Sequence, residues 1–148
     1  MQEQQGSNDI HLVFPATQDS VRDALGKITQ SLHALALDDM TIGTIEIVLA
    51  EATNNIVEHA YSDKGVGTIV LTCCKETSLV RFELIDQGLP FPGGEIPAKQ
   101  SHDLNAELNS LPEGGFGWGL IRDMTTSLSY RRSLGKNVLR FAILIEQH

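Results

Sequence analysis

Residues 51–59 read Glu-Ala-Thr-Asn-Asn-Ile-Val-Glu-His and end the most strongly periodic apolar segment of this 148-residue chain. At 3.6 residues per turn, the segment predicts a helix over 41–61. Its apolar face would carry five side chains: Ile45, Val48, Leu49, Ala52 and Ile56. On the other face Glu51, Asn55 and His59 follow at i, i+4 spacing, with neighbours about 6 Å apart. We therefore expect the helix to pack on a core and to present a polar ladder away from it.

This polar ladder is suited to phosphoryl chemistry. An Asn oxygen is a hard, neutral ligand for Mg²⁺, and a Glu one turn away can accept a proton from a water or a hydroxyl. A solvated helix face is the plain alternative. Two observations favour a functional polar face over a solvated one. Asn54 and Asn55 are poor helix formers in mid-helix. In addition, Ile47 lies one turn before Glu51, which suggests that this side of the helix is covered. We interpret His59 as a packing residue at the helix end.

A second informative stretch, residues 78–88, alternates in the manner of a strand. The alternation turns three apolar side chains toward a core: Val80, Phe82 and Leu84. Strand parity then places Asp86 on the same inward face. A buried carboxylate is costly unless it meets donors, and the exocyclic amine of adenine is a suitable donor. Gly88 lacks a Cβ where a flat base would approach closely. The alternative is a strand that ends in a solvated Asp-Gln-Gly turn.

A third stretch is the glycine run Gly115-Phe116-Gly117-Trp118-Gly119-Leu120, at the head of a helix expected over 117–126. Alternating glycines before a helix let backbone N–H groups close on a phosphate, and the helix dipole adds to the attraction. A mobile turn is the alternative. The spacing is not the G-x-G-x-x-G of a dinucleotide site, and the run lacks the Gly-Lys-Ser/Thr ending of a P-loop.

In this order the three stretches resemble the conserved boxes of the GHKL ATPase superfamily, which has the Bergerat ATP-binding fold. Within it, the chain is most similar to the small anti-sigma-factor serine/threonine kinases of bacteria, the RsbW type. Residues 51–59 resemble the N box, residues 86–88 the G1 box and residues 115–120 the G2 box. The resemblance covers about residues 10–146. It implies ATP and Mg²⁺ as cofactors.

The resemblance also implies roles for individual residues. Asn55 would be the Mg²⁺ ligand, and Glu51 the general base toward the hydroxyl that receives the γ-phosphoryl group. Asp86 would read the adenine, Gly88 would line the base pocket, and Asn137 would stand behind the base. Three glycines would admit the phosphates: Gly115, Gly117 and Gly119. Asn54 could replace Asn55 only if the helix were rotated, and the i+4 match to Glu51 favours Asn55.

Residues 89–114 hold four prolines and no sustained period, which is unusual for a loop in a small domain. The segment resembles the ATP lid of the family, and a short helix over 101–109 is expected within it. The segment carries Lys99 and His102 but no arginine, so it does not by itself supply a guanidinium for the γ-phosphate. Arg122, one turn into the next helix, could contribute, although a solvated or salt-bridged arginine is the simpler interpretation.

For function, the resemblance implies a kinase that phosphorylates a serine or threonine of a STAS-type antagonist protein. The same protein would alternately sequester a sigma factor or another target, so that it regulates transcription by partner switching, and a homodimer would fit the family. One alternative is a non-catalytic module in which ATP orders the lid and so sets the affinity for a protein partner. Another is the catalytic domain of a histidine kinase that works in trans.

Composition limits these hypotheses. The net charge is −8 and the longest basic cluster is Arg131-Arg132, so direct nucleic-acid binding is not expected. The N-terminal residues lack the pattern of a signal peptide, and no apolar run approaches a membrane span, so we expect a cytoplasmic protein. Cys73 and Cys74 are adjacent in an expected strand, which rules out a C-x-x-C redox pair or a zinc site.

We expect residues 1–9 to be disordered or poorly ordered and residues 10–148 to form a single ATP-binding kinase domain. The fold class is α+β, a two-layer sandwich of a mixed, mostly antiparallel sheet with helices on one face. The expected strands are 10–14, 67–75, 79–86, 127–132 and 137–146, and the expected helices are 18–36, 41–61 and 117–126. Hairpin turns are expected at residues 76–77 and 134–136.

Overall fold

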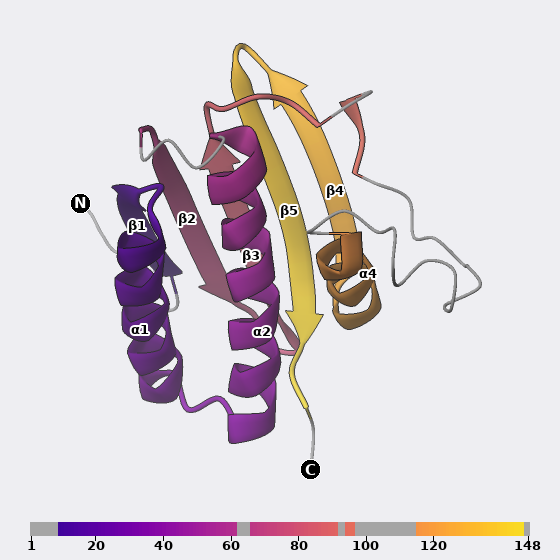
Figure 1. Cartoon of the computed structure of the whole chain (residues 1–148). Coiled ribbons are helices and arrows are strands. Elements are labelled where there is room, and N and C mark those ends of the chain that lie inside the picture. Colours follow the sequence, from indigo (N-terminus) through magenta and orange to yellow (C-terminus); the bar gives the residue numbers. More distant parts are fainter. Residues whose placement is uncertain (1–8, 62–65, 92–93, 97–114, 147–148) are drawn as a thin grey trace.

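The computed structural model describes residues 9–61, 66–91, 94–96 and 115–146, without the side chains of residues 115 and 116. Its elements are β1 (Asp9–Pro15), α1 (Gln18–Ala34), α2 (Asp39–Asn55), the π-helical turn η1 (Ile56–Ala60), β2 (Thr68–Lys75), β3 (Leu79–Asp86), α4 (Gly115–Met124), β4 (Thr126–Ser133) and β5 (Lys136–Leu144) (Figure 1). Three expectations fall outside these residues: the state of residues 1–8, the lid helix over 101–109, and the positions of Lys99 and His102.

The five strands form one sheet in the order β1-β2-β3-β5-β4. The α+β class is confirmed, with one difference from the expected mixed sheet: each neighbouring pair of these strands is antiparallel. Both predicted hairpins are present. The backbone N–H of Glu76 donates to the carbonyl of Leu79 (2.8 Å) in one. In the other, Leu134 and Gly135 have φ values of 53° and 79°, as a two-residue type I′ turn requires.

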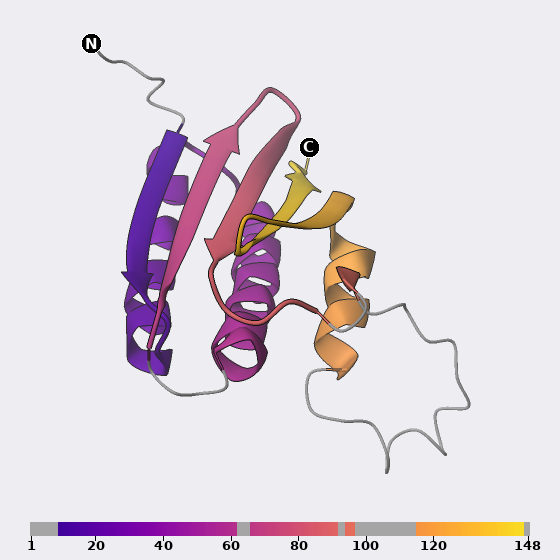
Figure 2. The ribbon, with the colours of Figure 1, turned by 90° about the horizontal axis from the view of Figure 1, so that it is seen from above.

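The three α-helices lie on the same face of the sheet, as the views of Figures 1 and 2 show. The core fills the space between the two layers. Its helical part includes Val21, Ile28, Leu32, Ile45, Val48, Leu49, Ala52, Trp118 and Ile121, and its sheet part includes Ile69, Leu71, Val80, Phe82, Leu84, Leu139, Phe141 and Ile143. The predicted apolar face of the 41–61 segment is therefore confirmed, since all five of its side chains are buried.

Helix ends explain where the structure departs from the expected boundaries. The side chain of Asp38 accepts a hydrogen bond from the backbone N–H of Thr41 (3.4 Å), and this cap starts α2 two residues early. Helix α1 stops at Ala34, before Ala36, whose φ of 64° is left-handed. Most important for the site, α2 ends at Asn55 and passes directly into η1. Asn55 thus stands at a change of helical geometry, of the kind that is frequent at functional sites.

The two cysteines behave as the sequence predicts. Cys73 is buried in the core, Cys74 is half-buried on the other face of β2, and both are free thiols. Burial raises the pKa of Cys73 to about 12, and a side-chain hydrogen bond with Asp9 is the main reason that the pKa of Cys74 rises to about 11. Both thiols therefore stay protonated at neutral pH. Across the described ranges, the helices fall short of the length and apolar character that a bilayer crossing needs.

Candidate functional site

One end of the candidate site forms where β3 and β5 pair. Asp86, the last residue of β3, lies opposite Asn137 on β5, and both residues are 5 % exposed. Oδ1 of Asp86 accepts hydrogen bonds from Nδ2 of Asn137 (2.7 Å) and from the backbone N–H of Gly88 (2.8 Å). The predicted inward parity of Asp86 is confirmed, and Asn137 lies directly beside the carboxylate.

The charge state of Asp86 is set by opposing effects. Burial raises the pKa of its carboxyl above the ordinary value of 3.8. The hydrogen bonds from Asn137 and Gly88, and the positive charge of Arg132, act in the opposite direction but are smaller. A further donor from a ligand would act in the same direction as these neighbours, because it would stabilise the ionised form of the carboxyl.

Asn137 is the centre of a network that includes two residues the sequence analysis missed. Its Nδ2 also donates to the carbonyl of Leu89 (2.9 Å), and its Oδ1 accepts from the hydroxyl of Tyr130 (2.5 Å) and from Nη1 of Arg132 (3.1 Å). Tyr130 and Arg132 belong to β4, the edge strand beside β5. Only the register of β4 against β5 could have pointed to them.

Gly88 is a glycine for a reason the sequence analysis did not give. A Cβ at this position would lie 2.3 Å from the backbone oxygen of Ala60, at the end of η1. The next residue, Leu89, donates its N–H to the same oxygen (2.8 Å). The close approach observed here is to the protein's own backbone; a role of Gly88 in lining a base pocket stays a prediction.

The other end of the site lies between α2 and the first turn of α4. Asn55 is buried, and its Nδ2 atom has no hydrogen-bond partner in the part of the chain that the structure describes. A Cβ on Gly117 would lie 3.4 Å from Oε1 of Glu51 and 3.6 Å from Nδ2 of Asn55. The structure thus brings Glu51, Asn55 and one glycine of the run together.

Three other residues of the 41–61 segment do not belong to this contact: Asn54, His59 and Ile47. Asn54 has partners elsewhere, since it accepts from Nε2 of Gln18 (3.0 Å) and donates to Oε2 of Glu58 (3.1 Å), which supports Asn55 as the residue left for a ligand. The interpretation of His59 as a packing residue is wrong, because its side chain is 54 % exposed. Ile47 is 45 % exposed, so it does not show the helix face to be covered there.

The whole glycine run lies inside α4, whereas the expected helix over 117–126 included only part of it. The helix begins at Gly115, two residues earlier than expected, and includes Gly117 and Gly119. A Cβ on Gly119 would meet no atom within 4 Å. Arg122, further along α4, donates to the carbonyl of Ile96 (3.3 Å). Whether the three glycines admit phosphates stays a prediction. Gly115 and Gly117 lie in the first turn of α4, at the positive end of the helix, and Gly119 follows in the second turn.

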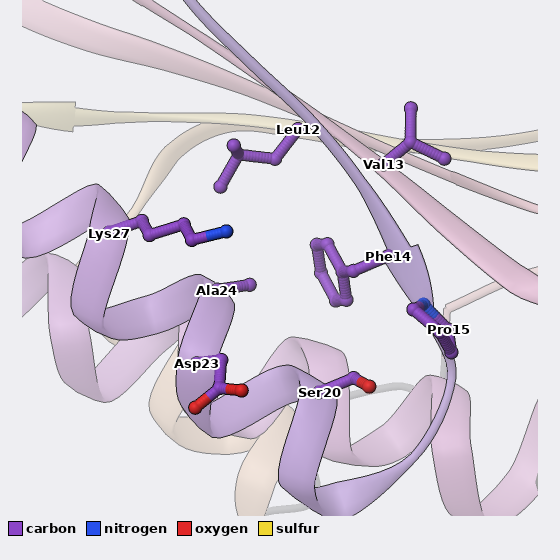
Figure 3. Close-up of a pocket in the computed structure, with 8 residues that line it drawn as sticks. All are labelled: Leu12, Val13, Phe14, Pro15, Ser20, Asp23, Ala24 and Lys27. Atoms are coloured by element: carbon purple, nitrogen blue, oxygen red, sulfur yellow. The ribbon is translucent and has the colours of Figure 1, made fainter.

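The two ends of the site are joined through the backbone and through aromatic rings. Turn η1 starts directly after Asn55 and ends at Ala60, which contacts Gly88. On the other side, the ring of Phe91 packs on Tyr130 and edge-on against Trp118, with centroids 4.4 and 5.0 Å apart. A cavity of about 240 Å³ between β1 and α1 lies elsewhere, and none of the predicted site residues lines it (Figure 3).

Asn55 fits the Mg²⁺ ion that the resemblance to the GHKL superfamily implies. A buried amide with one orphaned atom gains when a ligand supplies the missing partner. A half-turn of the amide puts Oδ1 where Nδ2 now lies, so the same position can offer an oxygen to a cation or a donor to a phosphate. In the described ranges, no three His, Cys, Asp or Glu side chains gather as a metal cluster. Mg²⁺ takes few protein ligands and shares phosphate oxygens, so a single amide oxygen is enough for the role that the resemblance implies for Asn55.

Comparisons with known proteins identify the family of this chain. The family described as "Histidine kinase-like ATPase domain" matches residues 14–143. The chain is 30 % identical over 105 residues to proteins named serine-protein kinase RsbW from Bacillus mycoides, Bacillus cereus and Bacillus anthracis. Each match covers 70 % of this chain, and the chain spans 64 % of the length of these curated relatives.

Solved structures show the same fold. The RsbU and RsbW domains of Rv1364c from Mycobacterium tuberculosis match with a TM-score of 0.66 and 18 % identity, over 94 % of this chain and 33 % of that one. The SiaB-SiaC complex from Pseudomonas aeruginosa matches with a TM-score of 0.54 and 18 % identity, over 92 % of this chain and 89 % of that one. The family model matches most of the length of this chain, and the chain therefore belongs to the histidine kinase-like ATPase domain family.

Proposed function

We propose that this protein is an ATP-dependent serine/threonine protein kinase and anti-sigma factor, which acts in partner switching on a STAS-type antagonist. The observation that carries the proposal is the position of Glu51 and Asn55 against the first turn of α4, with Nδ2 of Asn55 buried and unpartnered in the described part. The similarity to proteins named serine-protein kinase RsbW supports the same activity.

Each residue of the site has a task in this reaction. Bound Mg·ATP would supply the γ-phosphoryl group and neutralise its charge. Asp86 would accept a hydrogen bond from the exocyclic amine of adenine, and Asn55 would hold the metal ion that neutralises the phosphate charge. Glu51 accepts the proton of the incoming serine or threonine hydroxyl, whose oxygen bonds to the γ-phosphorus while the bond to the β–γ bridging oxygen breaks and ADP leaves. Such transfer depends mainly on positioning and charge neutralisation.

Label transfer from γ-labelled Mg·ATP to a purified STAS-type antagonist tests the proposal. Wild-type protein should label the antagonist, and Glu51→Gln should slow transfer by about 1,000-fold, the range of a lost general base. Its affinity for ATP should stay within about threefold, because Gln keeps the size of the side chain. Glu46→Gln is the matched control on α2, since the Glu46 carboxylate accepts from the hydroxyl of Thr29 (3.0 Å) and lies outside the site.

Transfer by Glu51→Gln at the wild-type rate would contradict the role of Glu51 as base. Tight ATP binding by wild-type protein without any transfer or hydrolysis would instead indicate a nucleotide-binding interaction module. The partner-switching part is tested separately by gel filtration. A sigma factor should co-elute with the protein in the presence of Mg·ATP and should be released when unphosphorylated antagonist is added, and the same elution volumes report whether the protein is a homodimer.

A further inference from the structure

The network around Asp86 leaves one oxygen of the carboxylate for a ligand. Both hydrogen bonds that the described residues give to Asp86 end on Oδ1, from Asn137 and from the N–H of Gly88. Oδ2 is therefore the oxygen that can accept from a bound base. Because Oδ1 is held by two donors, the plane of the carboxylate and the direction of Oδ2 are fixed.

The orientation of the Asn137 amide is fixed in turn. At its oxygen end lie two donors, the hydroxyl of Tyr130 and the guanidinium of Arg132. At its nitrogen end lie acceptors, the carboxylate of Asp86 and the carbonyl of Leu89. A flipped amide would set the NH₂ group against the guanidinium and the oxygen against a carboxylate and a carbonyl, so the flip is strongly unfavourable.

Of the two donors, Tyr130 is the better anchored. Arg132 is exposed, and the same Nη1 atom also donates to the carbonyl of Gly88 (2.6 Å). The ring of Tyr130 packs on Phe91, and its hydroxyl also accepts from the backbone N–H of Phe91 (3.2 Å). With its acceptor site used by Phe91, the hydroxyl directs its hydrogen to Asn137.

We propose that Tyr130 is a positioning residue for base recognition: through Asn137 it aims Oδ2 of Asp86 at the exocyclic amine of a 6-aminopurine. Tyr130 thereby sets the preference for adenine nucleotides over purine nucleotides that lack this amine. The inference rests on the proposed function, because it assumes that the base of ATP lies at Asp86.

The experiment compares two ligands in three proteins. Affinities for ATP and for purine riboside triphosphate, which differs only by lacking the 6-amino group, are measured by titration calorimetry. Tyr61→Phe is the matched control: the hydroxyl of Tyr61 donates to the carbonyl of Thr68 (2.9 Å) and accepts from the N–H of Gln87 (2.7 Å), so it is similarly bonded but does not contact Asn137.

Wild-type protein should bind ATP about 30-fold more tightly than the analogue, the range for a hydrogen bond to a charged group. Tyr130→Phe should reduce this ratio to about threefold by weakening ATP binding alone, and Tyr61→Phe should keep the wild-type ratio. If Tyr130→Phe does not fold, Asn137→Ser removes the same link and should reduce the ratio equally.

A Tyr130→Phe protein that keeps the wild-type ratio overturns the inference, even if it binds both ligands more weakly, because a purely structural role weakens both alike. Equal affinity of wild-type protein for the two ligands also overturns the inference about Tyr130, but it does not contradict the proposal that the protein binds ATP. Failure of wild-type protein to bind either nucleotide contradicts the proposed function itself, so the two failures are distinguishable.

Discussion

At the strand end of the site, the polar groups of Asp86 and Asn137 are held by bonds of 2.5 to 3.1 Å to the protein's own atoms. At the helix end, Nδ2 of Asn55 is buried without a partner among the described residues, and the neighbouring backbone belongs to a glycine. The strand end is thus preorganised by register, whereas the helix end lacks a component that a ligand can supply. A substitution that disturbs the close backbone packing at the strand end should therefore lower stability, whereas a small substitution at the helix end should weaken ligand binding without lowering stability.

The largest loss of stability should follow from Gly88→Ala, at the strand end. The new Cβ would lie 2.3 Å from the carbonyl oxygen of Ala60, and both atoms are tied to backbone that cannot move aside cheaply. We expect the free energy of unfolding to fall by about 3 kcal/mol, the upper range for overpacking. Urea unfolding followed by circular dichroism measures it. A loss below about 1 kcal/mol would show that the turn is not closely packed against η1.

Asp86→Asn should give the next largest effect, a loss of affinity for ATP. The amide presents a donor where the carboxylate presented an acceptor, so ATP should bind about 100-fold more weakly. Stability should behave differently. Burial raises the pKa of the Asp86 carboxyl in the folded protein above the value of 3.8 that it has in the unfolded chain. The carboxyl therefore stabilises the folded protein at a pH below 3.8, and this stabilisation is lost as the pH rises through the folded pKa.

At pH 7 to 8 the Asp86→Asn protein should therefore be at least as stable as wild type. The advantage of the Asp86→Asn protein over wild type in the free energy of unfolding should shrink as the pH falls toward 3.8. Unfolding curves across this range check the sign. A variant that is much less stable at neutral pH, with an unchanged affinity for ATP, would mean that the carboxylate is structural and does not read a base.

Gly117→Ala should separate stability from binding at the helix end. The added methyl group would be in ordinary contact with Glu51 and Asn55, at 3.4 and 3.6 Å, and alanine favours a helix by about 1 kcal/mol over glycine. We expect unchanged or higher stability but ATP binding about 30-fold weaker, because the methyl group occupies space beside the phosphates.

Gly26→Ala in α1 is the control, since a Cβ there meets no atom within 4 Å. It should raise the melting temperature without changing the affinity for ATP. Equal ATP affinities of the Gly117→Ala and wild-type proteins would place the phosphates elsewhere.

Much of the fold could be predicted because periodicity records which face of an element is buried. The alternation through β3 placed Asp86 inward, and the 3.6-residue pattern of α2 placed Ile45 and Val48 in the core. Expected element boundaries differed from the observed ones by two residues or fewer, except that the segment expected as one helix over 41–61 is divided into α2 and η1. For α4 the early start has a plain reason: glycine has low helix propensity, but packing of Trp118 and Ile121 overrides it.

The parts of the site that could not be predicted depend on contacts between distant segments. Tyr130 reaches Asn137 only through the register of β4 on β5, which includes an irregularity between Thr126 and Ser129. The role of Gly88 depends on Ala60, which a π-helical turn places there, and no sequence period predicts such a turn. Single-residue exposure, as for His59, is likewise set by neighbours that are remote in sequence.

The account depends most on Asn55 as the residue that links the metal to the protein, and calorimetric titration with ATP in Mg²⁺ and in chelator tests this directly. Wild-type protein and Asn54→Ala should bind ATP about tenfold more tightly with Mg²⁺, whereas Asn55→Ala should bind equally with and without the metal. An Asn55→Ala protein that keeps the full tenfold dependence on Mg²⁺ would contradict the account.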